Sequence, residues 1–231
     1  MAFHILITGP KHSGKTSAGR ALAKIINQKF YDLDDLMEEE SLLSPRELFR
    51  KGPDVFKLHE NIALKNFLNK NESCVCAAGG GLIDNTDAMK TLSQSRDMSL
   101  FQNSVGFRKG FRKTDLKAGF SVKSKVAFQK TEVLKKPHEI NVFVFNVFIE
   151  VTAETAWNRI LEASQKNGLP AFLDASNPRE SHLKIHNRRS LLYKAAADIT
   201  IPAENKTPEA VAREIMQALP KTFLSIRKSE F

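Results

Sequence analysis

The most specific chemical pattern in the sequence is a glycine-rich stretch near the amino end. Residues 9–16 read Gly-Pro-Lys-His-Ser-Gly-Lys-Thr and match G-x-x-x-x-G-K-[ST]. In this pattern backbone N–H groups and a helix N-terminus point at polyphosphate oxygens, a lysine reaches the β- and γ-phosphates, and a hydroxyl joins the Mg²⁺ shell. The pattern therefore predicts a nucleoside-triphosphate site with Mg²⁺, in which Lys15 is catalytic and Thr16 is a metal ligand. The predicted nucleotide contacts are Gly9, Lys11, His12, Ser13, Gly14, Lys15, Thr16 and Ser17.

A second group of reactive side chains lies in residues 30–35, Phe-Tyr-Asp-Leu-Asp-Asp. If these residues continue an extended strand, Asp32 and Asp34 face the same side, about 6.6 Å apart. One carboxylate can then serve the metal shell while the other meets an acceptor hydroxyl. The alternative is that the aspartates cap a helix that continues through Leu36, and the two interpretations are compatible.

The segments around these side chains alternate between strand and helix patterns. Residues 3–8 are a mostly apolar, β-favouring run, and apolar residues at 18, 21, 22, 25 and 26 then follow helical spacing. Further strands are predicted at 29–33, 73–78, 142–151 and 197–202, and helices at 44–52, 54–69, after Thr152 and at 207–219. This alternation predicts an α/β fold, a parallel sheet with helices on both faces.

The composition is that of a folded, soluble domain. The chain has 231 residues, of which 42% are hydrophobic and 26% charged, which excludes fibrous and wholly disordered proteins. The two cysteines, Cys74 and Cys76, are too close in the sequence for a disulfide bond between them to stabilise the fold. Because disulfide bonds are typical of secreted proteins, we expect a cytoplasmic protein. The amino end leaves no room for a signal peptide, and no apolar run reaches the roughly 20 residues of a membrane span. We therefore expect no membrane association.

The positive charge is concentrated in one segment. Residues 94–141 hold eleven Lys/Arg against four acidic residues, so this segment carries +7 of the formal net charge of +9. About fifty residues lie here, where a short connection from helix to strand would suffice, so we predict a basic insertion. Its tandem Gly-Phe-Arg-Lys repeat at 106–113 has three interpretations. These are a solvated loop, which is favoured, a partner contact, and a surface for nucleic acid or membrane lipid.

Seven short motifs in the sequence together resemble the shikimate kinase family of P-loop small-molecule kinases. They are the phosphate loop, Gly19-Arg20 with Leu22-Ala23, 30–34, Phe56-Lys57-Leu58-His59-Glu60, Gly79-Gly80-Gly81, 189–193 with Ala197-Asp198, and Lys206-Thr207-Pro208. The resemblance implies a three-layer P-loop NTPase with a five-stranded parallel sheet of order 2-3-1-4-5. It also implies a kinase core at 1–93 and 142–219 with a lid at about 165–180, beside the insertion at 94–141 and a C-terminal tail at 220–231.

The resemblance also implies an activity, phosphorylation of the 3-hydroxyl of shikimate by ATP and Mg²⁺. Asp34 would bind and help to deprotonate the acceptor, and Asp32 would hold Mg²⁺ through water. The substrate contacts would be Asp34, Lys57, Gly79, Gly80, Gly81 and Arg189, and Lys206 and Pro208 would lie beside adenine. A guanidinium such as that of Arg189 can bind a carboxylate in a planar fork. From the residues alone, an ion pair within a charged helix is the alternative role for Arg189.

Four positions depart from the family pattern. Lys57 replaces an arginine, Pro53 an acidic residue and His12 a glycine, and Leu169 stands where the lid arginine would be. The lid arginine would neutralise charge on the transferred phosphoryl group. Lys166, Arg179 or a residue of the basic insertion are the candidates to replace it.

These departures keep two alternatives to a shikimate kinase open. One is a kinase of another small sugar acid, such as gluconate. The other is a non-catalytic ATP-binding protein whose basic insertion binds nucleic acid or a partner. For the leading interpretation we expect a monomer with a small anionic polyol, shikimate, as its substrate.

Overall fold

The structure of the chain, a computed structural model, describes residues 2–95 and 142–220, apart from the side chains of residues 166 and 167. The expected basic insertion, except for its first two residues, lies outside these ranges, as does the expected tail after residue 220. Within the described ranges, no helix has the length and hydropathy that a membrane span requires.

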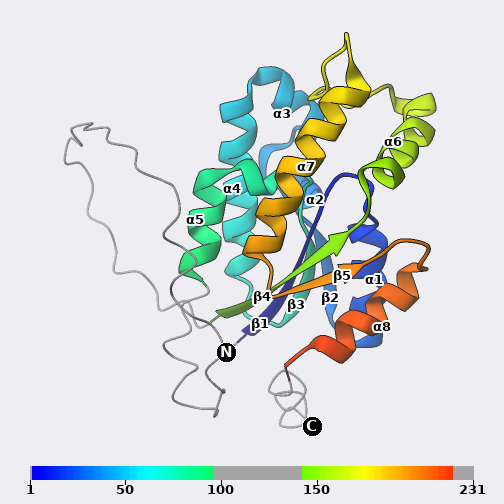
Figure 1. Cartoon of the computed structure of the whole chain (residues 1–231). Helices are drawn as coiled ribbons and strands as arrows, with labels where there is room; N and C mark the ends of the chain where they lie inside the picture. The colour runs from blue at the N-terminus through cyan, green and yellow to red at the C-terminus, as the bar shows by residue number, and fades with distance from the viewer. Residues whose placement is uncertain (1, 96–141, 221–231) are drawn as a thin grey trace, which may run out of the picture. The chain divides into compact units, whose positions relative to one another are not determined.

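Five parallel strands form one sheet in the order β2-β3-β1-β4-β5, which confirms the predicted α/β fold and strand order (Figure 1). The strands are β1 (Ala2–Thr8), β2 (Lys29–Asp32), β3 (Cys74–Ala77), β4 (Val142–Glu150) and β5 (Ile199–Pro202). In the centre of the sheet, Ile5 lies between Val75 of β3 and Phe145 of β4. Because all five strands are parallel, the loops at their carboxyl ends meet at one edge of the sheet.

Helices connect the strands and cover both faces of the sheet (Figure 1). They are α1 (Lys15–Ile25), α2 (Leu33–Ser41), α3 (Pro45–Lys51), α4 (Pro53–Leu68), α5 (Thr86–Gln94), α6 (Ala153–Asn167), α7 (Pro178–Ala196) and α8 (Pro208–Ala218), with a short 3₁₀ helix η1 (Leu82–Asp84). The prediction had no separate helix at α5, η1 or α7, although the side chains of Asn85 and Asn177 cap α5 and α7. In the fold, α5 packs against α4, and η1 packs against α7.

Local capping explains where several helices begin. Ser44 and Glu47 form the predicted capping box of α3: the Ser44 hydroxyl accepts from the Glu47 N–H, and the Glu47 carboxylate accepts from the Ser44 N–H. Thr152 and Thr207 cap α6 and α8 in the same way as predicted, each accepting an N–H of the first turn. Such caps satisfy donors that a helix leaves unpaired at its start.

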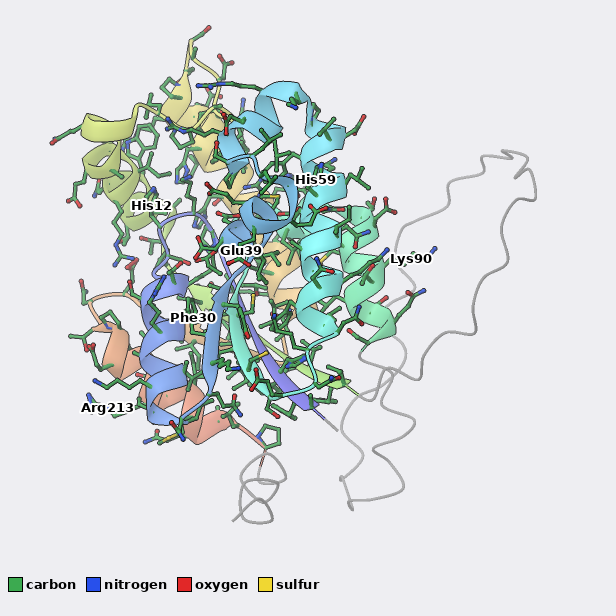
Figure 2. All side chains as sticks on the ribbon, turned by 180° about the vertical axis from the view of Figure 1, so that it is seen from behind. His12, Phe30, Glu39, His59, Lys90 and Arg213 are labelled. Carbon is green, nitrogen blue, oxygen red and sulfur yellow. The ribbon has the colours of Figure 1, made fainter. Side chains whose placement is uncertain are left out.

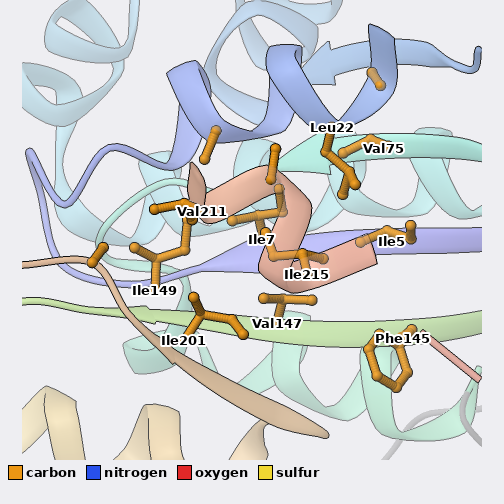
Figure 3. Packing of buried hydrophobic residues seen from close by; sticks show 14 of the residues in the cluster. Ile5, Ile7, Leu22, Val75, Phe145, Val147, Ile149, Ile201, Val211 and Ile215 are labelled. Carbon is orange, nitrogen blue, oxygen red and sulfur yellow. The ribbon is translucent and has the colours of Figure 1, made fainter. Parts of the chain in front are cut away.

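The core consists of two apolar layers on opposite faces of the sheet. Successive side chains of β1 alternate between these layers, because a strand has a two-residue period. Ile5 and Ile7 pack with Leu22 of α1 and Ile215 of α8 (Figure 3). Leu6 packs on the other face with residues of α2, α4 and α5. The central strand is therefore fully buried and rigidly supports the loop that follows it.

Candidate active site

The predicted site residues meet in one cavity at the carboxyl ends of the strands. The cavity has a volume of about 1350 Å³ and is bounded by the loop after β1, the start of α2, the loop after β3 and part of α7. The predicted residues that line it are Lys11, His12, Ser13, Gly14, Lys15, Thr16, Ser17, Asp32, Asp34, Lys57, Gly79, Gly80, Gly81, Arg189, Lys206 and Pro208. Among the predicted residues, Gly9 alone does not line the cavity.

Gly9 instead shapes the loop, together with two other left-handed positions. Gly9, His12 and Gly14 have φ angles of 147°, 60° and 94°. A Cβ at Gly9 would lie 2.6 Å from the carbonyl oxygen of Ile149, so a side chain would collide there. His12 adopts a conformation that glycine favours and that histidine tolerates at some conformational cost. The departure at His12 is therefore accommodated in the loop, on the turn that Figure 2 shows after β1.

Lys15 is buried at the bottom of this loop. Its Nζ donates to the carbonyl oxygen of Pro10 at 2.7 Å, which holds the ammonium group at the first turn of α1. Burial lowers the pKa of Lys15 to about 8, while the nearby carboxylates of Asp34 and Asp32 oppose this shift. The group is thus mostly charged at neutral pH and loses its proton more readily than an ordinary lysine.

Asp32 links the phosphate loop to the start of α2. Its Oδ2 accepts from the Thr16 hydroxyl at 2.8 Å, and its Oδ1 accepts from the Asp34 N–H at 3.1 Å. The expectation that Asp32 and Asp34 lie in one extended strand is wrong, because β2 ends at Asp32 and α2 begins at Leu33. Asp32 caps the helix, and the first helical turn then carries Asp34 into the same cavity.

Asp34 lies against the glycine triplet. A Cβ at Gly79 would lie 3.1 Å from Asp34 Oδ1 and 3.3 Å from Glu60 Oε1, so the absence of a side chain lets both carboxyl groups approach this backbone. Burial raises the pKa of Asp34, with a smaller contribution from the Asp32 carboxylate, and Lys15 opposes both effects. Asp34 is thus a better proton acceptor than an exposed aspartate.

Glu60 is a buried carboxyl group of the cavity wall that the sequence analysis did not single out. Its Oε2 accepts from Asn85 Nδ2 at 2.9 Å, while Oε1 has no hydrogen-bond partner among the described residues. Burial raises the pKa of Glu60 to about 7, and the Asp34 carboxylate adds to this shift. The sequence did contain a signal for Glu60, because this residue is the last one of the motif Phe56-Lys57-Leu58-His59-Glu60.

Arg189 reaches the other side of the glycine triplet from α7. Its Nε donates to Asp84 Oδ2 at 2.9 Å, and its NH1 donates to the Gly80 carbonyl oxygen at 2.8 Å. Tyr193, one turn later, donates to the same carbonyl oxygen at 2.9 Å. Arg189 therefore makes an ion pair, as the alternative interpretation held, and also lines the cavity. The two roles are compatible.

The remaining predicted contacts lie at the two ends of the cavity. Lys57 lines the end formed by α3 and α4, and its backbone carbonyl accepts from Asn85 Nδ2 at 2.8 Å. Lys206 and Pro208 line the cavity just before α8 and at its first residue, where Lys206 Nζ donates to Glu214 Oε2 at 2.7 Å.

The lid presents no arginine to the cavity. Gly168, Pro170, Ala171 and Phe172 line the cavity, whereas Leu169 does not and is 41% exposed. Arg179, one candidate for the missing cation, pairs with Glu154 at 3.0 Å and lines a separate groove of about 490 Å³. The expectation that Arg179 substitutes in the cavity therefore finds no support. The side chain of Lys166 and the basic insertion lie outside the described residues.

Arg159 of α6 is a cation of the cavity that the sequence analysis missed. Its NH1 donates to the carbonyl oxygen of His12 at 3.0 Å, which places a guanidinium beside the phosphate loop. No motif marks this position, because Arg159 and the loop lie almost 150 residues apart in the chain. Only the packing of α6 over the loop brings them together.

Comparisons with known proteins find sequence similarity to shikimate kinases. A family model described as shikimate kinase matches residues 11–104. The chain is 38% identical over 91 residues to the pentafunctional AROM polypeptide of Schizosaccharomyces pombe, a match that covers 38% of this chain and 6% of that polypeptide. It is 26% identical to the shikimate kinase of Streptococcus thermophilus, a match that covers 87% of this chain and 91% of that enzyme.

Solved structures agree on the fold. The shikimate kinase of Acinetobacter baumannii in complex with shikimate matches with a TM-score of 0.65 and 19% identity, over 94% of this chain and 92% of that one. The enzyme from Aquifex aeolicus matches with a TM-score of 0.55 and 24% identity, over 93% and 94%. The sheet order and the phosphate loop define a P-loop fold. Within this class, the chain is similar to shikimate kinases, whose family model matches residues 11–104.

Proposed function

We propose that this protein transfers the γ-phosphoryl group of ATP to the 3-hydroxyl of shikimate and so forms 3-phosphoshikimate. One observation carries the proposal: Asp34 and Arg189 flank the glycine triplet in the same cavity that contains the phosphate loop. An acceptor with a hydroxyl and a carboxylate needs a base and a cation in the same cavity as the phosphates, and Asp34 and Arg189 line that cavity. The names of the relatives, which are shikimate kinases, support the same substrate.

The nucleotide end would bind the triphosphate through the loop backbone and Lys15. The N-terminus of α1 and the ammonium group of Lys15 would both draw charge from the transferred phosphoryl group. We propose that Lys206 and Pro208 lie beside the adenine ring. The Arg159 guanidinium, held at the His12 carbonyl, adds positive charge at the mouth of the loop.

The donor set at Thr16 and Asp32 fits Mg²⁺. The hydroxyl and carboxylate oxygens lie 2.8 Å apart, and Mg²⁺ prefers such hard oxygen donors. The described residues contain no cluster of three or more His, Cys, Asp or Glu that could hold a metal, but Mg²⁺ usually takes one or two protein ligands plus phosphate and water. When bound, Mg²⁺ would neutralise charge on the β- and γ-phosphates.

The acceptor end would orient the hydroxyl for in-line attack. Asp34 would accept the hydroxyl proton as the new P–O bond forms, and its raised pKa suits a base working near neutral pH. Arg189 would hold the substrate carboxylate, with Lys57 contributing a second positive charge. The backbone of Gly79, Gly80 and Gly81 would lie against the ring without side chains between them.

A coupled assay of ADP release tests the proposal. We expect turnover to depend strictly on shikimate, and Asp34→Asn to lower kcat by roughly 10²- to 10⁴-fold because the general base is lost. Asp35→Asn is the matched control, since Asp35 lies in the same turn of α2, is exposed and does not line the cavity. Turnover that Asp34→Asn leaves unchanged would contradict the assigned base.

A second candidate is a kinase that acts on another small sugar acid. Lys57 favours this possibility, because an ammonium group recognises a carboxylate as a point charge rather than in a planar fork. Gluconate is the informative competitor substrate. If gluconate supports ADP release and shikimate does not, the second candidate replaces the first.

A non-catalytic role is the third candidate, motivated by the exposed Leu169 in place of a lid arginine. In that case MgATP would bind without any acceptor-dependent release of ADP. Salt-sensitive retention on RNA would then assign nucleic acid as the partner, through residues 94–141, of which the structure describes only the first two. Removal of that segment should abolish the retention.

We further propose that the protein works as a monomer in the cytoplasm. Both cysteines, Cys74 and Cys76, are unpaired and buried, which suits a reducing compartment. Size-exclusion chromatography with light scattering would test the monomer, and a mass near that of a dimer would contradict it.

A further inference from the structure

The lid of this chain contributes an aromatic ring to the acceptor end of the cavity. Phe172 lines the cavity, and its ring centroid lies 5.5 Å from Cζ of Arg189. This separation is within the range of a cation–π interaction. The lid segment thus touches the residue that we propose to hold the acceptor carboxylate, and none of the described lid side chains that line the cavity is a cation.

The other contacts of Arg189 fix the plane of the guanidinium. Asp84 accepts from Nε and Gly80 from NH1, whereas NH2 has no hydrogen-bond partner among the described residues. NH2 lies 3.7 Å from the place where a Cβ of Gly81 would be. The donors left for an anion therefore lie on the side of the glycine triplet, and Phe172 covers a face of the group. The Arg189 side chain is only 14% exposed as a result of these contacts.

The neighbouring lid residue anchors the ring. Leu173 is buried with Trp157 and Ile160 of α6, and Phe172 and Ile185 pack against this small cluster. The Leu173 N–H also donates to the Pro170 carbonyl oxygen at 3.1 Å, which closes a tight turn. Leu173 therefore fastens the lid to α6 while Phe172 is directed to Arg189. The position of the Phe172 ring is therefore set by its packing against this cluster.

We propose that Phe172 is a positioning residue for the acceptor carboxylate: its ring holds the Arg189 guanidinium in plane and keeps water from its face. This inference rests on the proposed function and concerns the same site. It gives Arg189 added importance, because Lys57 offers no second planar fork. A charged hydrogen bond also strengthens when water is excluded around it.

Steady-state kinetics with three variants test the proposal. Phe172→Ala should raise KM for shikimate about tenfold, which corresponds to about 1.4 kcal/mol, and leave KM for MgATP within about twofold. Phe172→Leu keeps apolar packing without the ring and should show most of the same effect. Phe172→Tyr keeps the ring and should behave like the parent chain. Leu169→Ala is the control, a lid residue that does not line the cavity.

A double-mutant cycle separates positioning from a structural role. In an Arg189→Gln background, Phe172→Ala should change KM for shikimate by less than about twofold, because the ring no longer has a cation to hold. Trp157 is the single tryptophan of the chain and packs in the cluster beside the ring, so its emission reports on the lid. Shikimate should shift this emission in the parent chain and much less in Phe172→Leu.

The possible results of these experiments distinguish a failure of this inference from a failure of the proposed function. If the parent chain uses shikimate and Phe172→Leu, correctly folded by circular dichroism, leaves KM unchanged, the inference is wrong while the proposed function stands. An equal loss in the Arg189→Gln background would also overturn it, since the ring would then act on the lid alone. If the parent chain shows no shikimate-dependent ADP release, the proposed function fails and this inference fails with it.

Discussion

The nucleotide end and the acceptor end of the cavity are built in different ways. At the nucleotide end, one contiguous loop between β1 and α1 supplies backbone N–H groups, Lys15 and Thr16. At the acceptor end, side chains arrive from α2, α4, the loop after β3, α7 and the lid. Three of the four departures from the family pattern, Pro53, Lys57 and Leu169, lie in the acceptor and lid segments.

This contrast shows which part of a kinase tolerates change. Backbone groups in a loop are positioned by φ and ψ angles, so a substitution such as His12 leaves most of them in place. Recognition by converging side chains depends on each group separately, and one replacement alters which acceptor fits. We therefore expect variants at the nucleotide end to lower kcat. Variants at the acceptor end, apart from those of the proposed base Asp34, should change mainly KM for the acceptor.

Apart from the loss of the proposed base Asp34, the largest expected effect is at Lys15. Lys15→Ala should lower kcat on the order of 10³-fold, because we propose that the buried ammonium group, which the Pro10 carbonyl holds in the loop, binds the phosphates. Lys24→Ala, in the last turn of the same helix and exposed, is the control and should retain parent activity. The measurement is ADP release at saturating shikimate. A decrease in kcat of less than tenfold in Lys15→Ala would contradict the expected difference between the two ends of the cavity.

A smaller effect, confined to the acceptor, is expected at the glycine triplet. Gly79→Ala would place a methyl group 3.1 Å from Asp34 Oδ1 and 3.3 Å from Glu60 Oε1. We expect KM for shikimate to rise roughly 10- to 30-fold with KM for MgATP unchanged, because only uniform acceptor binding is lost. In Gly81→Ala the nearest atom would be Arg189 NH2 at 3.7 Å, an ordinary contact, so we expect a smaller rise in KM for shikimate than in Gly79→Ala. Equal effects of the two variants would contradict the assignment.

The smallest expected effect is a pH dependence at the nucleotide end. Burial lowers the pKa of Lys15 to about 8. The side chain is therefore mostly protonated below pH 8, and it loses its positive charge as the pH rises through this value. Kd for MgATP should therefore rise about fivefold from pH 8 to pH 9, by proton linkage at one site. Calorimetry would measure it, with adenosine as the control ligand that has no phosphates. A flat Kd for MgATP over this range would show that Lys15 does not contact the phosphates.

Much of the fold follows from short stretches of sequence. Several features of the fold are local, because each is set by residues close together in the chain. Examples are the cap at Ser44, the positive φ at Gly14 and the apolar run of β1. Such features predicted the strands, the helices α3, α4 and α8, and the start of α6 to within two residues. The strand-to-helix boundary at Asp32 was predicted wrongly, because an aspartate pair suits either a strand end or a helix cap.

The sequence by itself determined the class of chemistry: a contiguous motif places the phosphate-binding loop, since its geometry arises from its own backbone. Only the tertiary structure decided the acceptor end. The approach of Glu60 to Gly79, the reach of Arg159 to the loop and the contact of Phe172 with Arg189 join segments far apart in the chain. No local pattern encodes such contacts, because they form only when helices pack on a shared sheet and bury their apolar faces.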